Sequence, residues 1–403
     1  MEVKKYDFRT IMLMLILFLS NVAIMGTTFY SVIMTQLYST YEEWVVNLTM
    51  SLPALVGLVA CLAAGKICDM MDKKVMFIAG LVLFAITGTV FGGFGYNSNL
   101  LMIGAAAFNG GICYGMVSVS AVGLITDCFG NEDQRGKVMG WYNGAMALVG
   151  AVLSMVYGGL AVIDWKLASQ ANWFALVVAV LTIFFVPACP PKKNNSTDSE
   201  AVKAQKAAKE KGWAKRLIPL LLAFFFVGFA YMTFQTYIDL YVSSNNLGDS
   251  AFTGLLGTVQ TLFSFVACTA FGFTYGKLKT KLSVIGYFVL ALGLVVLFLF
   301  PSKITVIAVT AVLGAAWGSV YTYWFFRATV VVPESMVGTA TGLITTANSL
   351  SYLPMAYVVT GSMAMMNTEN FTKTMPIYIV IIVICAVIAV FYNIKTGKEE
   401  AEA

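Results

Sequence analysis

Hydrophobic residues occur in long runs along this chain, and short polar stretches separate them. The runs fall at about residues 10–34, 44–64, 75–95, 100–125, 138–163 and 172–188, and then at about 217–241, 251–275, 282–300, 304–330, 337–362 and 375–394. Each run is about twenty residues long, which is the length an α-helix needs to cross a hydrocarbon layer about 30 Å thick. The pattern predicts an all-α membrane protein with twelve transmembrane helices.

The amino-acid composition favours the same class of protein. Hydrophobic residues make up 59% of the chain and charged residues 11%, whereas a soluble domain has about 45–50% apolar and about 25% charged residues. Lys4, Lys5 and Arg9 precede the first run, as they would in a secretory leader. The run continues to about Met34 without a small-residue cleavage site, so it is predicted to be the first spanning helix.

One long polar segment, residues 190–216, divides the twelve runs into two sets of six. The predicted domains are an N-terminal six-helix bundle (1–189), a cytoplasmic linker (190–215), a C-terminal six-helix bundle (216–394) and a cytoplasmic tail (395–403). Basic residues concentrate on one side of the predicted membrane: 22 of the 25, all but Lys166, Lys303 and Lys373, lie in the loops of that side or, as Arg327 does, in the end of a run next to it. The positive-inside rule therefore places both termini in the cytoplasm, and a bacterial inner membrane is the expected location.

The two sets of six runs share short similar segments. Arg135-Gly-Lys-Val-Met-Gly140 follows the fourth run, and Val337-Gly-Thr-Ala-Thr-Gly342 follows the tenth, 202 residues later. Residues 25–30 match residues 232–237 more weakly. Duplicated halves are typical of transporters that bind their substrate where the halves meet.

Several kinds of chemistry lack the residues that they require. The chain has no histidine, which excludes histidine metal sites, general bases and proton relays. Its net charge is +5, but the basic residues lie between hydrophobic runs, so no nucleic-acid surface is predicted. The seven cysteines form no Cys-x-x-Cys pair and are predicted to be structural thiols. We therefore expect no cofactor, no metal and no enzymatic activity. The cysteines are Cys61, Cys68, Cys113, Cys128, Cys189, Cys268 and Cys385.

A motif after the second run carries a family resemblance. Gly65-Lys-Ile-Cys-Asp69-Met-Met-Asp72-Lys73-Lys74 resembles the signature of the major facilitator superfamily, Gly-x-Leu-x-Asp-Arg-x-Gly-Arg-Lys. It departs from that signature at Met70 and Asp72. The resemblance implies two pseudo-symmetric six-helix bundles, secondary transport by alternating access, and a monomer that binds a small-molecule substrate within the lipid bilayer.

The same motif predicts a gate. A carboxylate near a helix N-terminus meets unpaired N–H groups and the positive end of the helix dipole. The resemblance implies that Asp69 is held near the start of the eleventh helix with help from Arg135, and Asp127 is the expected partner of Lys73 or Lys74. The alternative is a solvated turn that only enforces topology. The equivalent segment 272–281 lacks the acid, so the gate is predicted on one side only. The predicted gating residues are Gly65, Asp69, Lys73, Lys74, Asp127 and Arg135.

The fourth and fifth runs bear on proton-coupled export. Residues 150–159 are similar to the antiporter motif of drug exporters, but Ser154 and Met155 replace its central Gly-Pro, and ordinary packing of small residues is an equal alternative. Ala106 stands where proton-coupled exporters carry an arginine. Any proton coupling must therefore use another acid, for which Asp239 is the candidate. Otherwise Asp239 is an ordinary residue at the membrane interface.

Polar and aromatic residues in the first, seventh and tenth runs predict the substrate site. Hydroxyls and rings in an apolar wall suit an amphipathic organic solute better than an inorganic ion. Some of these aromatic residues could instead belong to the interfacial belt. Arg327 either binds a carboxylate of the substrate or extends to the interface as an anchor. The predicted cavity residues are Asn21, Thr28, Tyr30, Ser31, Gln235, Thr236, Tyr237, Trp317, Tyr321, Tyr323, Trp324 and Arg327.

These observations predict a secondary active transporter that moves a small organic solute, with organic anions as candidates through Arg327. A proton-coupled multidrug efflux antiporter is the alternative within transport. A channel or a membrane receptor is the alternative outside it. A channel requires a re-entrant filter or a ring of charges, and the sequence shows neither pattern.

Overall fold

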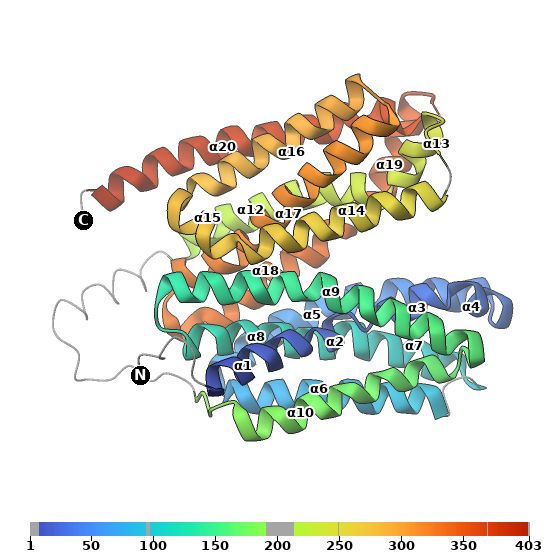
Figure 1. Ribbon diagram of the computed structural model, residues 1–403, viewed down its shortest axis with the longest axis vertical. Coiled ribbons are helices and arrows are strands. Elements are labelled where there is room, and N and C mark those ends of the chain that lie inside the picture. Colours follow the sequence, from blue (N-terminus) through green and yellow to red (C-terminus); the bar gives the residue numbers. More distant parts are fainter. Residues whose placement is uncertain (1–7, 94–96, 191–212, 249, 369, 402–403) are drawn as a thin grey trace. The chain divides into compact units, whose positions relative to one another are not determined.

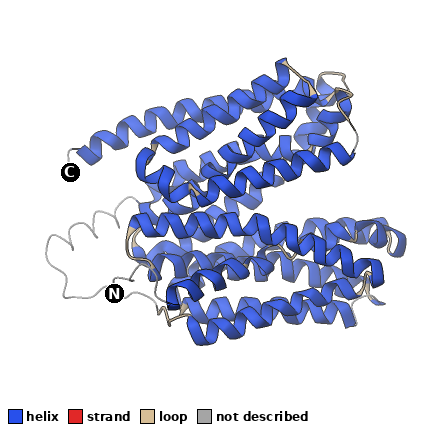
Figure 2. Cartoon of the chain, in the orientation of Figure 1, coloured by secondary structure: helices blue, strands red, loops and turns tan. Residues whose placement is uncertain are grey.

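The structure is a computed structural model that describes residues 8–93, 97–190, 213–248, 250–368 and 370–401. Within these ranges every regular element is a helix, and Figure 2 draws no strand. Most of the predicted linker, residues 191–212, lies outside the described residues, as do the last two residues of the predicted tail.

The first six predicted spans correspond to helical segments between residues 8 and 185. The first span is divided into α1 (Phe8–Leu19), α2 (Asn21–Ile24), α3 (Thr28–Val32) and α4 (Met34–Thr40). The other five are α5 (Glu43–Met70), α6 (Lys73–Gly93), then α7 (Asn99–Ala107), η2 (Phe108–Cys113) and α8 (Tyr114–Cys128) as one segment, α9 (Glu132–Asp164), and η3 (Leu167–Trp173) with α10 (Phe174–Phe185).

The remaining six predicted spans follow between residues 213 and 401. They are α12 (Trp213–Thr236) with α13 (Ile238–Ser244), α14 (Ser250–Thr269) with α15 (Phe271–Leu278), α16 (Lys281–Leu299), α17 (Lys303–Val331), α18 (Val337–Tyr352) with α19 (Met355–Met365), and η5 (Phe371–Thr374) with α20 (Met375–Ala401). The short helix η4 (Glu334–Met336) joins α17 to α18.

In the described residues, eight helices are long and apolar enough to cross a membrane, or nine if the bent pair of helices at 255–269 and 271–278 forms one span. The other three predicted spans are α1–α4, α6 and α18–α19. The first and third of these are interrupted by turns, so their apolar sequence is distributed over helices too short to cross alone. The all-α membrane fold predicted from the sequence is confirmed.

Contacts group the chain into two compact units. Unit 1 comprises the chain up to Leu217 together with Ala328–Ser349, and unit 2 comprises Ile218–Arg327 and Leu350–Ala403. The boundary therefore passes through α17 and α18, and the corner between these helices belongs to unit 1. The domain limits predicted from the sequence remain predictions.

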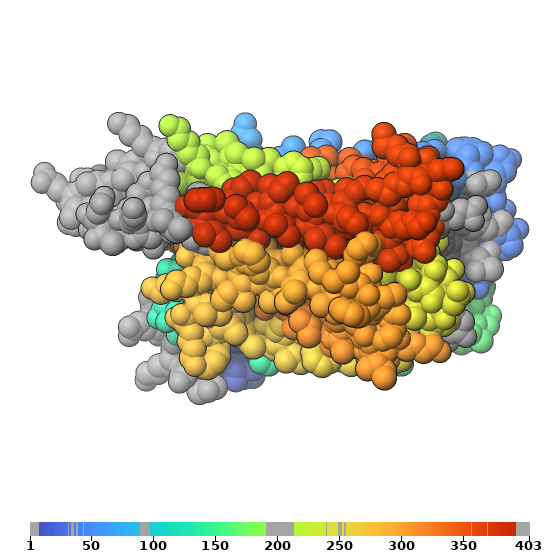
Figure 3. All heavy atoms as spheres, turned by 90° about the horizontal axis from the view of Figure 1, so that it is seen from above, coloured from blue at the N-terminus to red at the C-terminus, as the bar shows by residue number. Residues whose placement is uncertain are grey.

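Within unit 1, α6 packs against α8 and α10, and α9 packs against α1 and α2 (Figure 1). The first span is interrupted around Gly26, where no side chain would fit, since a Cβ atom would lie 2.2 Å from the Phe84 ring. Within unit 2, α16 and α20 lie side by side, as the orange and red atoms of Figure 3 show. Side chains such as Tyr287 and Tyr378 are fully buried there.

Candidate functional site

The Asp69 carboxylate, at the end of α5, binds the first turn of α18. Gly338 N–H donates to Asp69 Oδ1 at 2.8 Å, and Thr339 N–H donates to Asp69 Oδ2 at 2.8 Å. The Thr339 hydroxyl also donates to Oδ2 at 2.6 Å. The first N–H groups of a helix have no partner within the helix, and the helix dipole favours an anion beside them. We call the contact of Asp69 with Gly338 and Thr339 the Asp69 latch.

Glycines bring α5 and α18 close enough for this contact. A Cβ atom on Gly65 would lie 2.7 Å from the Gly338 carbonyl oxygen, and one on Gly338 would lie 2.6 Å from the Gly65 carbonyl oxygen. One turn further along α18, a Cβ atom on Gly342 would lie 2.3 Å from the Cys61 carbonyl oxygen. The two backbones are in direct contact, which only residues without a side chain permit.

Lys73, the first residue of α6, forms an ion pair with Asp127 near the end of α8. The Lys73 side chain is 4% exposed and the Asp127 side chain 8% exposed, so neither charge has ready access to water. Gly123 makes room for the lysine, since a Cβ atom there would lie 2.8 Å from Lys73 Cδ. The pairing matches the one expected from the sequence, and removal of either partner would leave an uncompensated buried charge.

Asp72 holds the turn between α5 and α6. Its Oδ1 accepts from Lys74 N–H at 2.8 Å, as an N-cap does, and from Cys189 N–H at 3.1 Å. The Lys74 ammonium donates to the Ile183 carbonyl oxygen at 2.8 Å. This turn thereby joins α5, α6 and the end of α10.

Arg135 lies in the first turn of α9, and its guanidinium donates to the carbonyl oxygens of Phe129 and Gly130 at 3.1 and 3.4 Å. In the described part of the chain these are its hydrogen bonds, and neither reaches Asp69. The expected help from Arg135 is therefore not part of the latch in this structure, because the arginine instead binds the carbonyl groups between α8 and α9.

The predicted cavity residues of the first span lie in unit 1, where the helix is interrupted. The Asn21 side chain is fully buried and donates to the carbonyl oxygens of Phe18 at 3.1 Å and Tyr142 at 3.3 Å. Thr28 is half-buried, and its hydroxyl donates to the Met25 carbonyl oxygen at 2.7 Å. Tyr30 is buried beside Phe29. The side chain of Ser31 lies outside the described residues.

The aromatic residues of α17 pack into a cluster inside unit 2. The Trp317 ring stacks on Tyr231 at a centroid distance of 4.7 Å, and Trp324 stacks on Phe224 at 4.4 Å. The Trp324 indole also donates to the Tyr287 hydroxyl at 2.7 Å. Trp317, Tyr323 and Trp324 are buried. Tyr321 is half-buried, with its ring 5.8 Å from that of Trp317.

The remaining predicted residues of unit 2 lie on α12, α13 and α17. Gln235 is half-buried, and its Oε1 has no hydrogen-bond partner among the described atoms. Tyr237 stands at the interruption between α12 and α13, and the half-buried Arg327 lies directly before the unit boundary on α17. Thr236 is exposed. The side chain of Asp239 is outside the described part, although its backbone belongs to α13.

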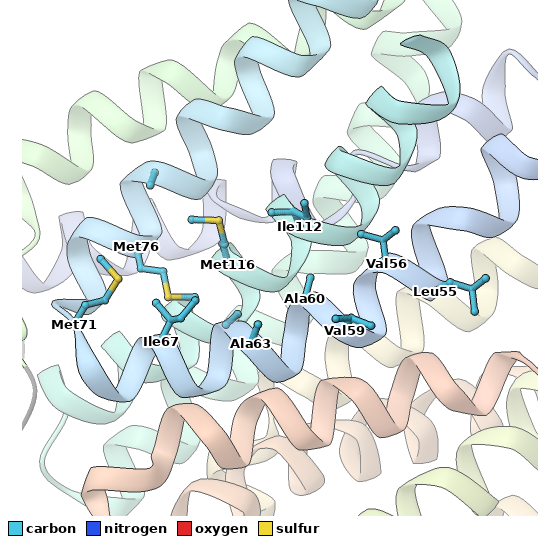
Figure 4. Close-up of a pocket in the computed structure, with 12 residues that line it drawn as sticks. Leu55, Val56, Val59, Ala60, Ala63, Ile67, Met71, Met76, Ile112 and Met116 are labelled. Carbon is cyan, nitrogen blue, oxygen red and sulfur yellow. The ribbon is translucent and has the colours of Figure 1, made fainter. Parts of the chain in front are cut away.

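Unit 1 also contains an apolar pocket of about 640 Å³ between α5, α6 and the η2–α8 segment (Figure 4). Val59, Ala63 and Ile67 of α5 line one wall, and Met76 and Met116 contribute to the others. Substrate sites combine apolar walls with a few polar groups that orient the ligand. None of the predicted cavity residues lines this pocket.

Three residues where α18 meets α5 were not singled out as site residues from the sequence: Gly338, Thr339 and Gly342. Gly338 N–H donates one hydrogen bond of the Asp69 latch. Thr339 supplies two of the three hydrogen bonds, and Gly342 permits the close crossing of α5 and α18. The internal repeat that ends at Gly342 was the available signal. The matching segment of the first half, residues 135–140, lies in the first turns of α9. The repeat therefore indicates that residues 337–342 also begin a helix.

Comparison with known proteins shows a family match over most of the chain. The family model of the Major Facilitator Superfamily matches residues 11–356. Among curated relatives, the quinolone resistance protein NorA of Staphylococcus aureus (strain MRSA252) is 27% identical over 184 residues, 44% of each chain. The multidrug resistance protein MdtL of Vibrio parahaemolyticus is 27% identical over 160 residues, 39% of each chain. The chain thus spans less than half the length of the curated relatives it matches.

Solved structures resemble the whole fold. The transporter FucP in the outward conformation has a TM-score of 0.74 at 16% identity, covering 96% of this chain and 99% of FucP. The proton:xylose symporter XylE has a TM-score of 0.70 at 14% identity, covering 94% of both chains. A bacterial homologue of the iron transporter ferroportin has a TM-score of 0.74 at 13% identity, covering 96% and 100%. These identities are low, so the similarity concerns the fold.

Proposed function

This chain belongs to the Major Facilitator Superfamily, and on that premise we propose that it is a membrane transporter that carries a small organic solute by alternating access between two helix bundles. The proposal places it in a bacterial inner membrane as a monomer with both termini in the cytoplasm. The distribution of lysine and arginine between alternate loops supports this orientation.

The Asp69 latch is the observation that carries the proposal. Its three hydrogen bonds join the end of α5 to the start of α18, two helices that the sequence assigns to different halves. Alternating access requires contacts that are strong in one state and absent in the other. A carboxylate at a helix N-terminus suits such a contact. When the contact opens, water can hydrogen-bond to the carboxylate in place of the helix N–H groups.

The residues of the proposed cavity favour an amphipathic solute. The half-buried Tyr321 offers a ring and a hydroxyl, and next to it the buried rings of Trp317 and Tyr231 stack on each other as an apolar wall. Gln235 carries a buried oxygen with no partner among the described atoms, which a donor on a solute could satisfy. Arg327 would supply the positive charge for an organic anion.

Multidrug efflux driven by protons is the second candidate function. The relatives named quinolone resistance protein and multidrug resistance protein support drugs as the solute class. The buried Ala106 weighs against it, since exporters of this type place an arginine there. Asp239 is the acid on which coupling would then depend.

A binding screen tests the solute class first. Ligands that bind the native state raise the apparent melting temperature, so the purified protein should be heated with norfloxacin, ethidium, L-fucose, D-xylose, citrate and benzoate in turn. A shift with benzoate or citrate supports the anion class, whereas shifts confined to norfloxacin and ethidium support the efflux alternative.

Flux through proteoliposomes tests the mechanism. Uptake of the radiolabelled screening hit should saturate, and unlabelled hit on the opposite side should accelerate it. Flux that does neither would replace the carrier with a channel. If uphill transport requires a pH gradient, Asp239→Asn should abolish the uphill component and spare exchange. Normal coupling in that variant would remove Asp239 from the proposal.

A further inference from the structure

Two cysteine thiols that the transport proposal does not use lie next to each other at the turn between α5 and α6. Cys128 is the last residue of α8, and Cys189 follows α10. Their Sγ atoms are 3.8 Å apart and within hydrogen-bonding distance for sulfur. We call Cys128 and Cys189 the cysteine pair. Both thiols are free in this structure.

The backbone of Cys189 is held in place from two directions. Its N–H donates to Asp72 Oδ1 at 3.1 Å, and its carbonyl oxygen accepts from Lys73 N–H at 3.2 Å. Cys128 is fixed at the end of α8, directly after Asp127, which forms the ion pair with Lys73. The proximity of the two sulfur atoms is therefore built by contacts on both sides.

The surroundings also favour a reactive thiolate. The pKa of the Cys189 thiol is lowered, mainly by a hydrogen bond from the Cys128 thiol and also by the positive charge of Lys73. Burial and the carboxylates of Asp127 and Asp72 oppose this effect without reversing it. Thiolates rather than thiols attack oxidants, and neighbouring cations promote their formation.

We propose that Cys128 and Cys189 form a thiol modification site that closes to an intramolecular disulfide when the protein meets a peroxide. The Cys189 thiolate attacks one oxygen of hydrogen peroxide, whose O–O bond breaks, and gives a sulfenic acid; the hydroxide that leaves takes up a proton and becomes water. The Cys128 sulfur then attacks the sulfenic sulfur, the S–S bond forms, and the hydroxyl leaves with the Cys128 proton as a second water. Two thiols are oxidised and one peroxide is reduced.

The bond requires a modest movement. A disulfide has an S–S distance of about 2.05 Å, so the sulfur atoms must approach by somewhat less than 2 Å. Residues 187–190 have no helical structure, and rotation of the Cys189 side chain can provide this approach. Cys128 is half-buried, and Cys189 is 8% exposed. The other five cysteines are buried in helices, and no hydrogen bond joins two of their sulfur atoms in the described residues.

Both cysteines lie in unit 1. The disulfide would join parts of the same unit, so it should not prevent a movement of one unit against the other. The inference stands independently of the transport proposal, because its test counts thiols.

The test uses the full-length protein in detergent, reduced and then freed of reductant. After treatment with hydrogen peroxide and denaturation, the remaining thiols are alkylated with N-ethylmaleimide and counted by intact mass. Wild type should fall from seven reactive thiols to five, with full recovery after dithiothreitol. A tryptic peptide pair linking the segments around Cys128 and Cys189 should appear in the oxidised sample.

Cys189→Ala should retain all six remaining thiols under the same exposure. Cys128→Ala should form no disulfide and should lose at most one thiol, as a sulfenic acid at Cys189. Cys385→Ala, which removes a cysteine of α20 in unit 2, is the matched control and should still lose two. Seven thiols in oxidised wild type, or a loss of two in either pair variant, would overturn the site. If an alanine variant fails to fold, the cross-linked peptides of the oxidised wild type provide the test. A link between Cys128 and Cys189 supports the proposal, and a link between any other two cysteines contradicts it.

Discussion

Replacing Asp69 with asparagine removes the charge of the latch and keeps the shape of the side chain. Asp69 Oδ2 accepts both bonds from Thr339, and Oδ1 accepts the bond from Gly338. Asparagine has one oxygen, so at least one backbone N–H then faces an NH₂ group that cannot accept. The bonds that remain lose their charge assistance.

The magnitude follows from these three bonds. Each hydrogen bond to a charged group contributes about 1.5–3 kcal/mol. The loss of one bond and the weakening of the others should cost about 2–4 kcal/mol. At ~1.4 kcal/mol per factor of ten, this changes the equilibrium between latched and open states roughly 30- to 700-fold. One of the two states then becomes rare, and we expect transport to fall about tenfold or more.

The assay is the initial rate of exchange in proteoliposomes containing equal amounts of folded protein. Asp72→Asn is the matched control: it makes the same chemical change three residues away, and asparagine caps a helix as well as aspartate does. Thr339→Val removes the hydroxyl bond alone and should have a smaller effect. The Asp69→Asn/Thr339→Val double variant should lose less than the sum of the single variants, because the two residues share one contact. Wild-type rates in Asp69→Asn, or an equal loss in Asp72→Asn, would refute the reasoning.

Three further changes test other parts of the site. Gly338→Ala should reduce transport and folded yield strongly, because its Cβ atom would meet backbone at 2.6 Å, whereas Gly159→Ala, which has open space around it, should behave as wild type in the same yield and flux assays. Lys73→Met should destabilise the protein by about 3–5 kcal/mol in thermal unfolding, because it leaves the Asp127 charge buried without a partner. The double variant Lys73→Met/Asp127→Leu should recover part of this stability. Equal stability of Lys73→Met and wild type would contradict a buried ion pair. If Arg327 binds an anionic substrate, apparent affinity measured by exchange should fall for Arg327→Lys and fall further for Arg327→Gln, and unchanged affinity in both would make it an anchor.

Local sequence was sufficient to predict the class of fold. Span length and hydropathy are properties of short segments, so all twelve spans could be located without knowledge of their neighbours. Only their continuity differs: α1–α4 and α18–α19 are interrupted. At this turn the Phe84 ring leaves no room for a side chain on Gly26, and hydropathy does not report such a contact between residues far apart in the sequence.

The candidate site could be predicted only where a motif combined charges with a helix end. The role of Asp69 and the pairing of Lys73 with Asp127 could be predicted in this way. A buried charge requires a partner of opposite charge, and the sequence has few charged residues near the ends of these spans. The chain alone did not show that Arg135 binds the carbonyl groups of Phe129 and Gly130. Backbone acceptors are present at every position, so sequence cannot select among them.

The sequence by itself determined a twelve-span membrane protein in two sets of six, with its charges concentrated at the ends of the spans. Only the tertiary structure decided that the start of α18 belongs with α5, that Gly65 and Gly342 allow their backbones to touch, and that Cys128 lies beside Cys189. The physical reason is that burial in a bilayer depends on local hydrophobicity, which is roughly additive along the chain. Contacts between distant segments depend instead on shape and on hydrogen-bond geometry, which exist only after the helices have packed.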